Sequence, residues 1–249
     1  MPDRLRMRER ARPPLRSPIG AFPRRLQSLS RGRPLPPLPR RSRETQGSRN
    51  FWGSWRTRAS LLAVTVRRAL VVGASSDIGT AVAASLAGLG HELVLWGRDR
   101  DRLAAAAAAC GEASVAVVDV TDGDAMRAAL AEVPAGGLDV VVWAAGDFDW
   151  APAHEADGER WRQLLDVNLT SAAVLTTLVL PTLVERAPSA LVYIGSGAAR
   201  RAYPGNAAYV ASKHGLAGLA HAVFLDVRDH GVKVSVVSPG LVAARKSRA

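Results

Sequence analysis

The feature that most constrains the fold is a regular alternation of two kinds of segment that begins at Arg67. Short runs of β-branched and other apolar residues alternate with longer, often alanine-rich stretches of helical periodicity. This alternation is typical of βαβ units, whose strands pair in parallel and are covered by helices. Strands are predicted at residues 69–72, 92–96, 114–118, 139–144, 190–194 and 233–237, and helices at 78–89, 100–110, 123–132, 159–185 and 207–229.

Six strands joined by five helical crossovers predict an α/β fold. The expected architecture is one doubly wound parallel sheet of six strands with helices on both faces. In such a sheet the ligand binds at the carboxyl ends of the strands. The functional residues are therefore expected just after the strands, within residues 61–249.

Residues 1–60 differ from the rest of the chain in charge and composition. They contain 16 Arg against three acidic residues, a net charge of +13, together with 9 of the 15 Pro. Residues 61–249 carry 17 basic and 19 acidic side chains, a net charge of −2, so the formal +11 of the chain arises from the first 60 residues. A segment so poor in periodic apolar residues buries too little surface to fold, and we expect a disordered, basic, Arg/Pro-rich tail.

Other interpretations of residues 1–60 stay open. Arg33–Arg41 has the PxxPxR spacing of an SH3 ligand, and a basic segment also suits nucleic acid. We expect neither interaction, because Arg- and Pro-rich segments produce such patterns by chance. A transit peptide is another alternative, although the prolines break the helix that it needs. A further one is a gene-model extension ahead of a true start near Val64 or Val66.

The compartment is predicted from cysteine usage and hydropathy. Cys110 is the only cysteine, which excludes an intrachain disulfide and argues against a thiolate metal site. The Arg-rich start is not followed by the apolar stretch of a secretory signal, and the longest apolar run, around 172–184, is interrupted by Thr and Pro. We therefore expect a soluble cytoplasmic protein without a metal site or membrane contact.

The first predicted strand leads through a glycine-containing loop directly into an apolar helix. At such a junction a dinucleotide pyrophosphate binds backbone amides and the helix dipole. Gly73 permits the tight turn, and Gly79 lets helix and strand approach closely. A plain strand-to-helix turn is the alternative. The predicted cofactor contacts in this loop are Gly73, Ser75, Ser76, Asp77, Ile78 and Gly79.

The end of the second predicted strand favours NADP over NAD. Gly97 offers no carboxylate where an NAD enzyme places one, and Arg98 offers a guanidinium suited to a 2′-phosphate. A solvated loop arginine is the alternative. Asp119, followed by Val120, ends the third strand, where its carboxylate is placed to accept a hydrogen bond from the adenine amine. A simple cap of the next helix is an equally frequent role for such an Asp.

Tyr209 and Lys213 lie four residues apart in a stretch of helical spacing, so the phenol and the ammonium project from one helix face. A free phenol is a poor base near neutral pH, and a neighbouring ammonium stabilises the phenolate. With three Tyr and three Lys in the chain, about 0.04 such pairs are expected by chance. The pair indicates acid–base chemistry, with a tyrosine packed on a lysine stem as the alternative.

Two further polar residues complete the predicted reaction centre. Ser196 ends the fifth strand, where its hydroxyl is placed to hydrogen-bond a carbonyl oxygen as charge develops. Asn168 lies within the predicted helix 159–185, although Asn is a poor helix former. Holding a water molecule in a proton relay is one reason for its presence there.

Together these residues resemble the short-chain dehydrogenase/reductase family, whose fold is a Rossmann-like doubly wound sheet. The resemblance covers roughly residues 66–242 and rests on residues in the family's order and spacing, namely Gly73–Gly79, Asp119, Ala144-Ala145-Gly146, Asn168, Ser196, Tyr209, Lys213 and Pro239-Gly240. It implies that residues 61–249 form an NAD(P)-binding domain. It also implies cofactor contacts at Ala145, Gly146, Tyr209, Lys213, Pro239 and Gly240.

The resemblance further implies an oxidoreductase that transfers hydride between a nicotinamide cofactor and a small-molecule carbonyl or alcohol. In the family's mechanism Tyr209 is the general acid/base and Lys213 holds the nicotinamide ribose while easing loss of the tyrosine proton. Ser196 positions the carbonyl, and Asn168 supports a water chain to Lys213. A homo-oligomer that assembles through the two long helices is also implied.

The sequence departs from the family at several positions. Asp77 stands in place of the middle glycine of the cofactor loop, so that a carboxylate lies close to the expected pyrophosphate and is predicted to lower cofactor affinity. Val72 replaces the usual Thr, and Trp143-Ala144 replaces an asparagine pair that braces the fourth strand.

A larger departure follows Pro239-Gly240. The family continues through a substrate-binding loop, a helix and a seventh strand, whereas this sequence ends at Ala249. We expect a C-terminal truncation that removes part of the substrate pocket. Two functions follow from these observations: an NADP-preferring dehydrogenase/reductase, or a catalytically silent dinucleotide-binding protein that acts as a binding or assembly partner.

Overall fold

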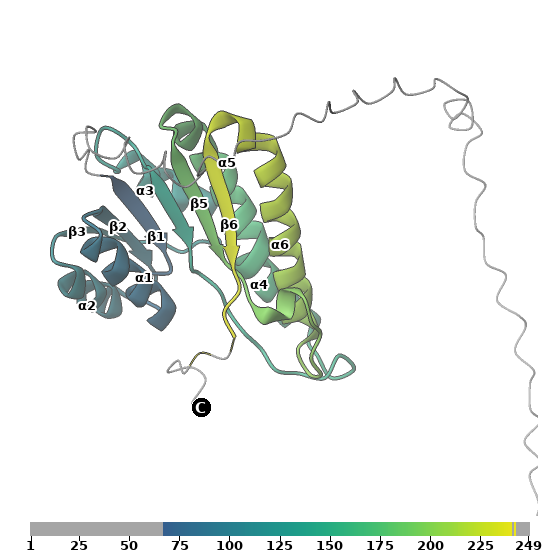
Figure 1. Ribbon diagram of the computed structural model, residues 1–249. Helices are drawn as coiled ribbons and strands as arrows, with labels where there is room; N and C mark the ends of the chain where they lie inside the picture. Colours follow the sequence, from purple (N-terminus) through teal and green to yellow (C-terminus); the bar gives the residue numbers. More distant parts are fainter. Residues whose placement is uncertain (1–66, 241, 243–249) are drawn as a thin grey trace, which may run out of the picture. The chain divides into compact units, whose positions relative to one another are not determined.

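Six short strands form one parallel sheet in the computed structural model, which describes residues 67–240 and residue 242 (Figure 1). The strands are β1 Arg68–Val72, β2 Glu92–Gly97, β3 Ala113–Val117, β4 Val140–Trp143, β5 Ser189–Ile194 and β6 Val232–Val237. Their order in space is β3-β2-β1-β4-β5-β6. The predicted doubly wound sheet is confirmed, whereas the prediction of a disordered tail at residues 1–60 lies outside the described residues.

Helices connect the successive strands. In the described part of the chain they are α1 Asp77–Gly88, α2 Arg100–Cys110, α3 Gly123–Ala131, α4 Gly158–Leu165, α5 Ser171–Glu185 and α6 Ala207–Val227. A π-helical turn, η2 Asp166–Thr170, joins α4 to α5, and the short 3₁₀ helices η3 Gly197–Ala199 and η4 Arg228–His230 flank α6. Each crossover returns the chain to a parallel strand, as a βαβ unit requires.

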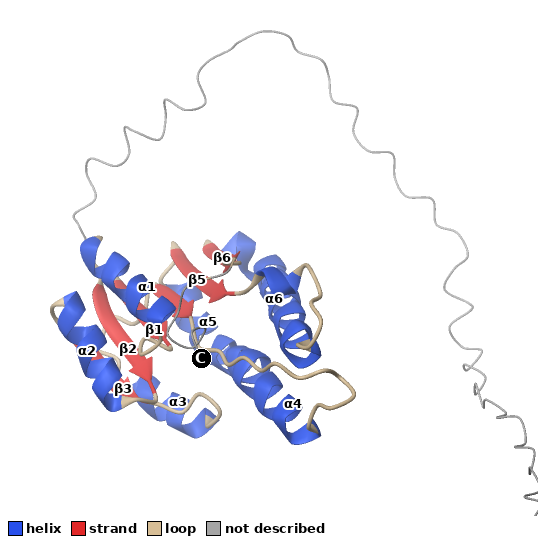
Figure 2. Cartoon of the chain, turned by 90° about the horizontal axis from the view of Figure 1, so that it is seen from below, coloured by secondary structure: helices blue, strands red, loops and turns tan. Residues whose placement is uncertain are grey.

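The sheet separates two apolar cores, so helices cover both of its faces (Figures 1 and 2). On one face, side chains such as Ala69 and Val71 pack with residues of α1 and α2. On the other face, Leu70, Val72 and their neighbours pack with α3, α5 and α6. The central strand β1 is therefore buried on both sides, which explains its uninterrupted apolar sequence.

The strand order also fixes where a ligand binds. β1 pairs with β2 on one side and with β4 on the other, so the chain leaves the centre of the sheet in opposite directions. At such a switch point the loops that follow the neighbouring strands diverge and open a crevice at their carboxyl ends. In this sheet the crevice is therefore expected between the loops that follow β1 and β4.

The predicted continuous α-helix over residues 159–185 is wrong at its middle, where the π-helical turn η2 lies. Asn168 lies within this turn, fully buried, and its side-chain amide hydrogen-bonds to the backbone of Asp147 and to Ser212. Such tertiary hydrogen bonds compensate for the poorer backbone geometry of a π turn, and π turns are frequent at functional sites.

Within the described residues, one helical stretch, Gly158–Glu185, is long and apolar enough to cross a membrane by length and composition. Its 28 residues exceed the short apolar run considered from the sequence. Leu175, Val179 and Leu183 of this stretch are buried in the larger core against the sheet. The same composition is therefore expected of a core helix in this fold.

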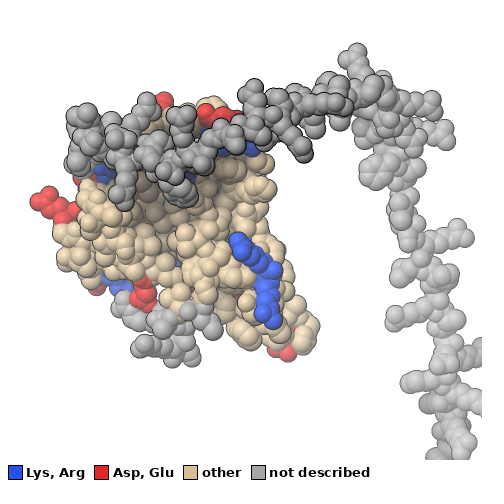
Figure 3. Space-filling model, viewed as in Figure 1, with Lys and Arg blue, Asp and Glu red and all other residues tan. Residues whose placement is uncertain are grey.

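The charge of the described part is close to balanced. Residues 67–240 carry 14 Lys and Arg against 19 Asp and Glu, which gives a net charge of −5. The face of the molecule shown in Figure 3 carries few charged side chains.

Candidate active site

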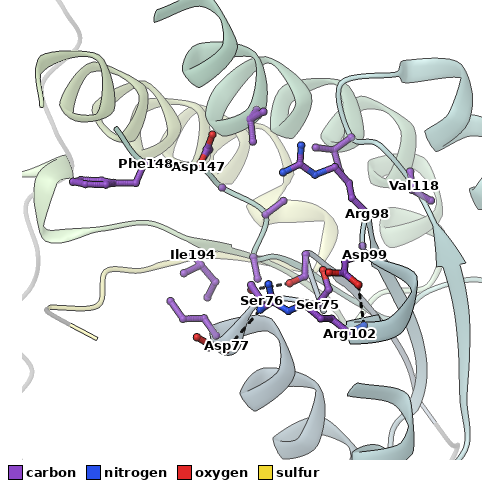
Figure 4. A pocket seen from close by; sticks show the side chains of 18 of the residues that line it. Ser75, Ser76, Asp77, Arg98, Asp99, Arg102, Val118, Asp147, Phe148 and Ile194 are labelled. Carbon is purple, nitrogen blue, oxygen red and sulfur yellow. Dashed lines mark hydrogen bonds and ion pairs between the residues drawn. The ribbon is translucent and has the colours of Figure 1, made fainter. Parts of the chain in front are cut away.

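A cavity of about 640 Å³ opens at the carboxyl ends of the strands (Figure 4). Its volume lies within the range typical of sites for small molecules and cofactors. Most of the predicted site residues line it, although they come from five separate segments of the chain. They are Gly73, Ser75, Ser76, Asp77, Ile78, Arg98, Val120, Ala145, Gly146, Tyr209 and Lys213.

Gly73 and Gly79 give the loop before α1 its shape. Gly73 has φ +84°, and a Cβ there would lie 2.6 Å from the backbone nitrogen of Ala145. A Cβ at Gly79 would overlap the carbonyl oxygen of Gly73, so α1 approaches β1 this closely only with glycine. Gly79 does not line the cavity, so the cofactor contact expected of it stays a prediction.

Ser76 caps the start of α1. Its Oγ accepts a hydrogen bond from the backbone N–H of Gly79 at 3.0 Å and donates one to the carbonyl oxygen of Gly73 at 2.7 Å. The cap fixes the loop so that Ser75, Ser76 and Ile78 line the cavity at the positive end of the helix dipole. These residues fit a dinucleotide, because a pyrophosphate binds at a helix N-terminus of this kind.

Asp77, the unusual acid of the loop, is the first residue of α1 and forms an ion pair with Arg102 of α2. The Asp77 Oδ1 and Arg102 Nη2 atoms are 3.8 Å apart. Both side chains line the cavity, and Figure 4 shows them at the same side of it. Position 77 adopts helical backbone geometry, so glycine is not required there, and the guanidinium offsets the negative charge that an acid brings towards a phosphate.

At the end of β2 the cavity wall contains Gly97 and Arg98. A Cβ at Gly97 would lie 2.6 Å from Oγ of Ser75, which shows how closely the two loops pack. Arg98 presents its guanidinium to the cavity (Figure 4). The sequence also predicted a contact at Asp119, whose Oδ1 instead accepts hydrogen bonds from the amide (2.9 Å) and hydroxyl (2.8 Å) of Thr121.

These hydrogen bonds, led by the Thr121 amide, lower the pKa of the Asp119 carboxyl. Asp119 thus stabilises the turn before α3, whereas the N-cap of that helix, the alternative role expected for Asp119, is Asp122. Asp119 lies outside the cavity wall, while Val118 and Val120 line it. The adenine contact stays a prediction. Pro239 and Gly240 also lie outside the wall, although the Pro239 carbonyl oxygen accepts a hydrogen bond from the Gly197 amide beside Ser196.

Tyr209 and Lys213 project from the first turns of α6 into the cavity. The Lys213 Nζ lies 5.7 Å from the centroid of the Tyr209 ring and donates a hydrogen bond to the carbonyl oxygen of Ile194 at 3.2 Å. Lys213 is only 5% exposed. Burial lowers the pKa of the Lys213 ammonium to about 8.

Asn168 connects this pair to the loop after β4. Its Oδ1 accepts a hydrogen bond from the Asp147 amide at 2.7 Å, and its Nδ2 donates to the Asp147 carbonyl oxygen at 2.9 Å and to Ser212 Oγ at 3.0 Å. A Cβ on Gly146 would lie 3.3 Å from Asn168 Oδ1 and 3.5 Å from Lys213 Nζ. Asn168, Gly146 and Lys213 are therefore packed together at one wall of the cavity.

Ser196 lies directly after the cavity-lining residues Ile194 and Gly195 and is the N-cap of η3. Its Oγ accepts a hydrogen bond from the Ala198 amide at 3.1 Å. Ser196 itself does not line the cavity, so the structure places it next to the wall rather than in it. Three of the four predicted catalytic residues thus lie in or against the wall, and the fourth follows it in sequence.

The sequence did not predict several residues of the cavity wall. They are Gly97, Asp99, Arg102, Val118, Ala144, Asp147, Phe148, Val167, Ile194 and Gly195. Most of them lie at the carboxyl end of a predicted strand or within two residues of a predicted site residue, a signal that the topology alone supplies. Arg102 has no such signal, because it lies four residues after Arg98 within α2 and reaches the wall only through the packing of α2 beside α1. No group of three His, Cys, Asp or Glu side chains able to hold a metal occurs among residues 67–240 and 242.

The doubly wound sheet with this loop and this Tyr–Lys pair at one cavity has the architecture of a dinucleotide-dependent oxidoreductase. The chain belongs to the short-chain dehydrogenase/reductase family, because the family model for short chain dehydrogenases matches residues 67–248. The sequence-based resemblance is thereby confirmed. Enzymes of this family are oxidoreductases that use NAD(P).

Similar proteins include an uncharacterized oxidoreductase of Myxococcus xanthus (strain DK1622), 38% identical over 185 residues, with 72% of this chain and 73% of that protein covered. A 3beta-hydroxysteroid dehydrogenase of Mediterraneibacter gnavus is 37% identical over 177 residues, which cover 68% of this chain and 64% of that protein. The crystal structure of serine dehydrogenase from Escherichia coli matches with a TM-score of 0.67 and 31% identity, over 70% of this chain and 83% of that one. The chain thus spans less than two thirds of the second relative's length.

Proposed function

We propose that the protein is an NADP-preferring oxidoreductase that interconverts a carbonyl compound and the corresponding alcohol, with Tyr209 as general acid/base. One observation carries this proposal: Tyr209 and Lys213 line the same cavity as the loop residues Ser75–Ile78. A proton-transfer group and a dinucleotide-binding loop therefore share one space.

The residues that would hold the cofactor follow from the wall of the cavity. Backbone amides at the start of α1 suit the pyrophosphate, and the Arg98 guanidinium suits a 2′-phosphate. Ala145, Gly146 and Lys213 lie further along the wall, where the nicotinamide half would reach. When bound, the nicotinamide exchanges hydride with the substrate carbon.

The proton is handled by Tyr209. During reduction its phenol donates a proton to the substrate oxygen as negative charge develops there, and during oxidation the phenolate accepts that proton. Lys213 is buried beside the phenol with its Nζ 5.7 Å from the ring centroid, so its positive charge stabilises the phenolate in a site of low polarity. Lys213 is charged below a pH of about 8.

Ser196 and Asn168 have supporting roles. The Ser196 Oγ accepts a hydrogen bond from the Ala198 amide. The O–H of Ser196 is therefore left to donate a hydrogen bond to the carbonyl oxygen of the substrate. Asn168 holds the wall beside Lys213 through its hydrogen bonds to Asp147 and Ser212. In this position it is placed to support a water chain that returns a proton to Lys213.

The names of the relatives support the reaction class and not a narrower substrate. They include a 3beta-hydroxysteroid dehydrogenase, a gluconate 5-dehydrogenase and a sulfoacetaldehyde reductase. The compounds in these names share an alcohol or carbonyl group and differ in size and charge. We also propose that the protein is cytoplasmic and forms a homo-oligomer, as the family resemblance implies.

Tyr209→Phe tests the proposed function. Purified protein is incubated with NADPH and a panel of aldehydes and ketones, and the loss of NADPH absorbance is followed. We expect turnover by the unchanged protein and a loss of at least about 100-fold in Tyr209→Phe, because the proton donor is removed. NADPH binding, followed by its fluorescence, is expected to persist in the variant, and NADH is expected to bind more weakly than NADPH.

Tyr203→Phe is the matched control, because Tyr203 is an exposed tyrosine that does not line the cavity. Turnover that survives in Tyr209→Phe would contradict the assigned role. NADPH binding without turnover by the unchanged protein would support the catalytically silent alternative.

A further inference from the structure

Phe148 is a large apolar side chain that stays half exposed at the cavity. It follows Gly146 and Asp147 in the loop after β4, lines the cavity, and is 48% exposed. Its ring meets that of Tyr209 edge-on, with centroids 4.9 Å apart and an interplanar angle of 75°. Figure 4 shows Phe148 at one end of the cavity and Val118 at the opposite end.

The backbone that carries Phe148 is held on both sides. Asn168 hydrogen-bonds to both the N–H and the carbonyl oxygen of Asp147. Arg160 of α4 donates a hydrogen bond from Nη2 to the Phe148 carbonyl oxygen at 3.1 Å. The ring is therefore presented from a fixed segment, so its position beside Tyr209 is organised before a ligand arrives.

Arg160 also neutralises the acidic side chains that flank Phe148. Its Nη1 is 2.9 Å from Asp147 Oδ2, and its Nε is 3.3 Å from Asp149 Oδ2. The hydrogen bond to Asp147 is the main cause that raises the pKa of the Arg160 guanidinium, which keeps the pair charged together. The segment thus places an apolar ring, rather than an uncompensated charge, next to the phenol.

Two wall residues on other elements are also apolar. Val167 of η2 and Ile194 of β5 line the same cavity as Phe148. A ligand that covers the exposed half of the Phe148 ring would remove apolar surface from water, which favours binding.

We propose that Phe148 is a specificity-determining residue whose exposed ring contacts the apolar part of the substrate, and that the substrates are bulky carbonyl compounds or alcohols with an aromatic or alicyclic ring. This inference rests on the proposed function. The substrate oxygen binds at Tyr209, and the ring of the substrate packs on Phe148 next to it. Short or strongly polar carbonyl compounds leave the Phe148 ring uncovered.

The test compares two carbonyl substrates in the unchanged protein and in Phe148→Ala. One substrate is the bicyclic aromatic ketone 1-tetralone, and the other is the short aldehyde propanal, both with NADPH. We expect the unchanged protein to have the higher kcat/KM for 1-tetralone. Phe148→Ala is expected to lower that value by about tenfold to a hundredfold and to change the value for propanal by less than about threefold.

Phe148→Leu and Leu89→Ala are the companion variants. Phe148→Leu keeps an apolar side chain without a ring and is expected to give an intermediate ratio. Leu89→Ala removes a large apolar side chain from a 76% exposed position after α1 that does not line the cavity, and its substrate ratio is expected to stay unchanged. A higher kcat/KM for propanal in the unchanged protein would overturn the proposal.

An equal loss for both substrates in Phe148→Ala would also overturn it, because Phe148 would then act only by positioning Tyr209. If neither substrate turns over, the proposed function fails, but the inference is still tested by binding. Calorimetric titration of 1-tetralone into the protein saturated with NADPH is then expected to show an affinity at least about tenfold lower in Phe148→Ala. Equal affinity in the two proteins would contradict the inference.

Discussion

Lys213 combines a positive charge with nearly complete burial. It is 5% exposed, its Nζ hydrogen-bonds to the Ile194 carbonyl oxygen, and burial lowers its pKa from 10.5 to about 8. The native state therefore disfavours the charged form, and Lys213 costs stability near neutral pH. A buried cation that the fold does not need is instead suited to the phenolate chemistry proposed for Tyr209.

Lys213→Met is expected to raise the free energy of unfolding near neutral pH by about 2 kcal/mol while turnover is lost. The unfolded chain binds a proton at Lys213 below about pH 10.5, and the native protein does so only below about pH 8. Between these values the unfolded state holds more protons, so stability rises with pH, and the full cost is present below about pH 8. Lys213→Met is expected to remove this rise, as measured by urea unfolding across the window.

Lys233→Met is the matched control, because Lys233 is an exposed lysine on β6. Its unfolding free energy is expected to stay within about 0.5 kcal/mol of the unchanged protein. A lower stability in Lys213→Met would mean that the ammonium stabilises the fold, contrary to this interpretation.

Asp77 is a residue whose ion-pair partner could not be predicted from the sequence. An acid in the cofactor loop predicts weaker phosphate binding, because like charges repel. The prediction omits Arg102, which lies 25 residues later in the chain and forms a 3.8 Å ion pair with Asp77 across the cavity wall. The packing of α1 beside α2 creates this pair, and no local motif announces it.

At the scale of elements, the strands were predictable because short runs of β-branched and other apolar residues mark them, and the inner strands β1, β2 and β4 are almost wholly buried. Each observed strand end lies within one residue of the prediction, as β1 Arg68–Val72 illustrates against residues 69–72. The loop after Gly73 and the Tyr209–Lys213 pair could be predicted from the sequence equally well, because both depend on local spacing. The position of Phe148 against Tyr209 was not predictable, because it depends on contacts between α4, η2 and α6 that leave no periodic pattern.

The π-helical turn η2 was also missed, for a related reason. A stretch of helical periodicity predicts one continuous helix, whereas the backbone at Asp166–Thr170 adopts a wider turn. Asn168 bonds there to a backbone segment 21 residues earlier. Interactions over that distance override local helix preference.

Asn168→Ala tests whether these bonds hold the element in place. The substitution leaves the amide and carbonyl of Asp147 without their partner, and each such group costs about 1–3 kcal/mol when buried. We expect the free energy of unfolding to fall by about 3 kcal/mol and the Asp147 amide to exchange faster with deuterium. Thr177→Ala, at an exposed polar position of α5, is expected to change neither measurement.

A change below about 1 kcal/mol in Asn168→Ala, with unaltered exchange at Asp147, would show that η2 is stable without its tertiary bonds. Both readouts are independent of turnover. They therefore separate the structural role of Asn168 from the proton-relay role proposed for it.

At the scale of the whole molecule, the fold gathers the site from distant segments. The sheet order places the loops after β1 and β4 at one switch point, and α6 brings Tyr209 to the same edge. The larger core holds α5 and α6 against β4, β5 and β6. Any assembly that uses the outer side of α6 would therefore support the helix on which Tyr209 and Lys213 lie.

Gly218 offers a clean test of the proposed homo-oligomer. It is exposed on α6, and a Cβ built there meets no atom within 4 Å, so an arginine fits without a clash inside the protomer. Arginine also favours a helix more than glycine does, by about 0.5–1 kcal/mol. Gly218→Arg is thus expected to fold at least as well as the unchanged chain while placing a bulky charge wherever two α6 helices pack together.

We expect size-exclusion chromatography with light scattering to show an oligomer for the unchanged protein and a shift towards monomer for Gly218→Arg. Gly88→Arg is the matched control, because Gly88 at the end of α1 also has no atom within 4 Å of a built Cβ but lies on a helix outside the predicted interface. If both variants keep the mass of the unchanged protein, the interface does not use α6. If the unchanged protein is itself a monomer, the site must work within one chain, and the alignment of Tyr209 then depends on contacts inside the protomer. These are the packing of α6 in the larger core, the hydrogen bonds of Asn168 and the Phe148 ring.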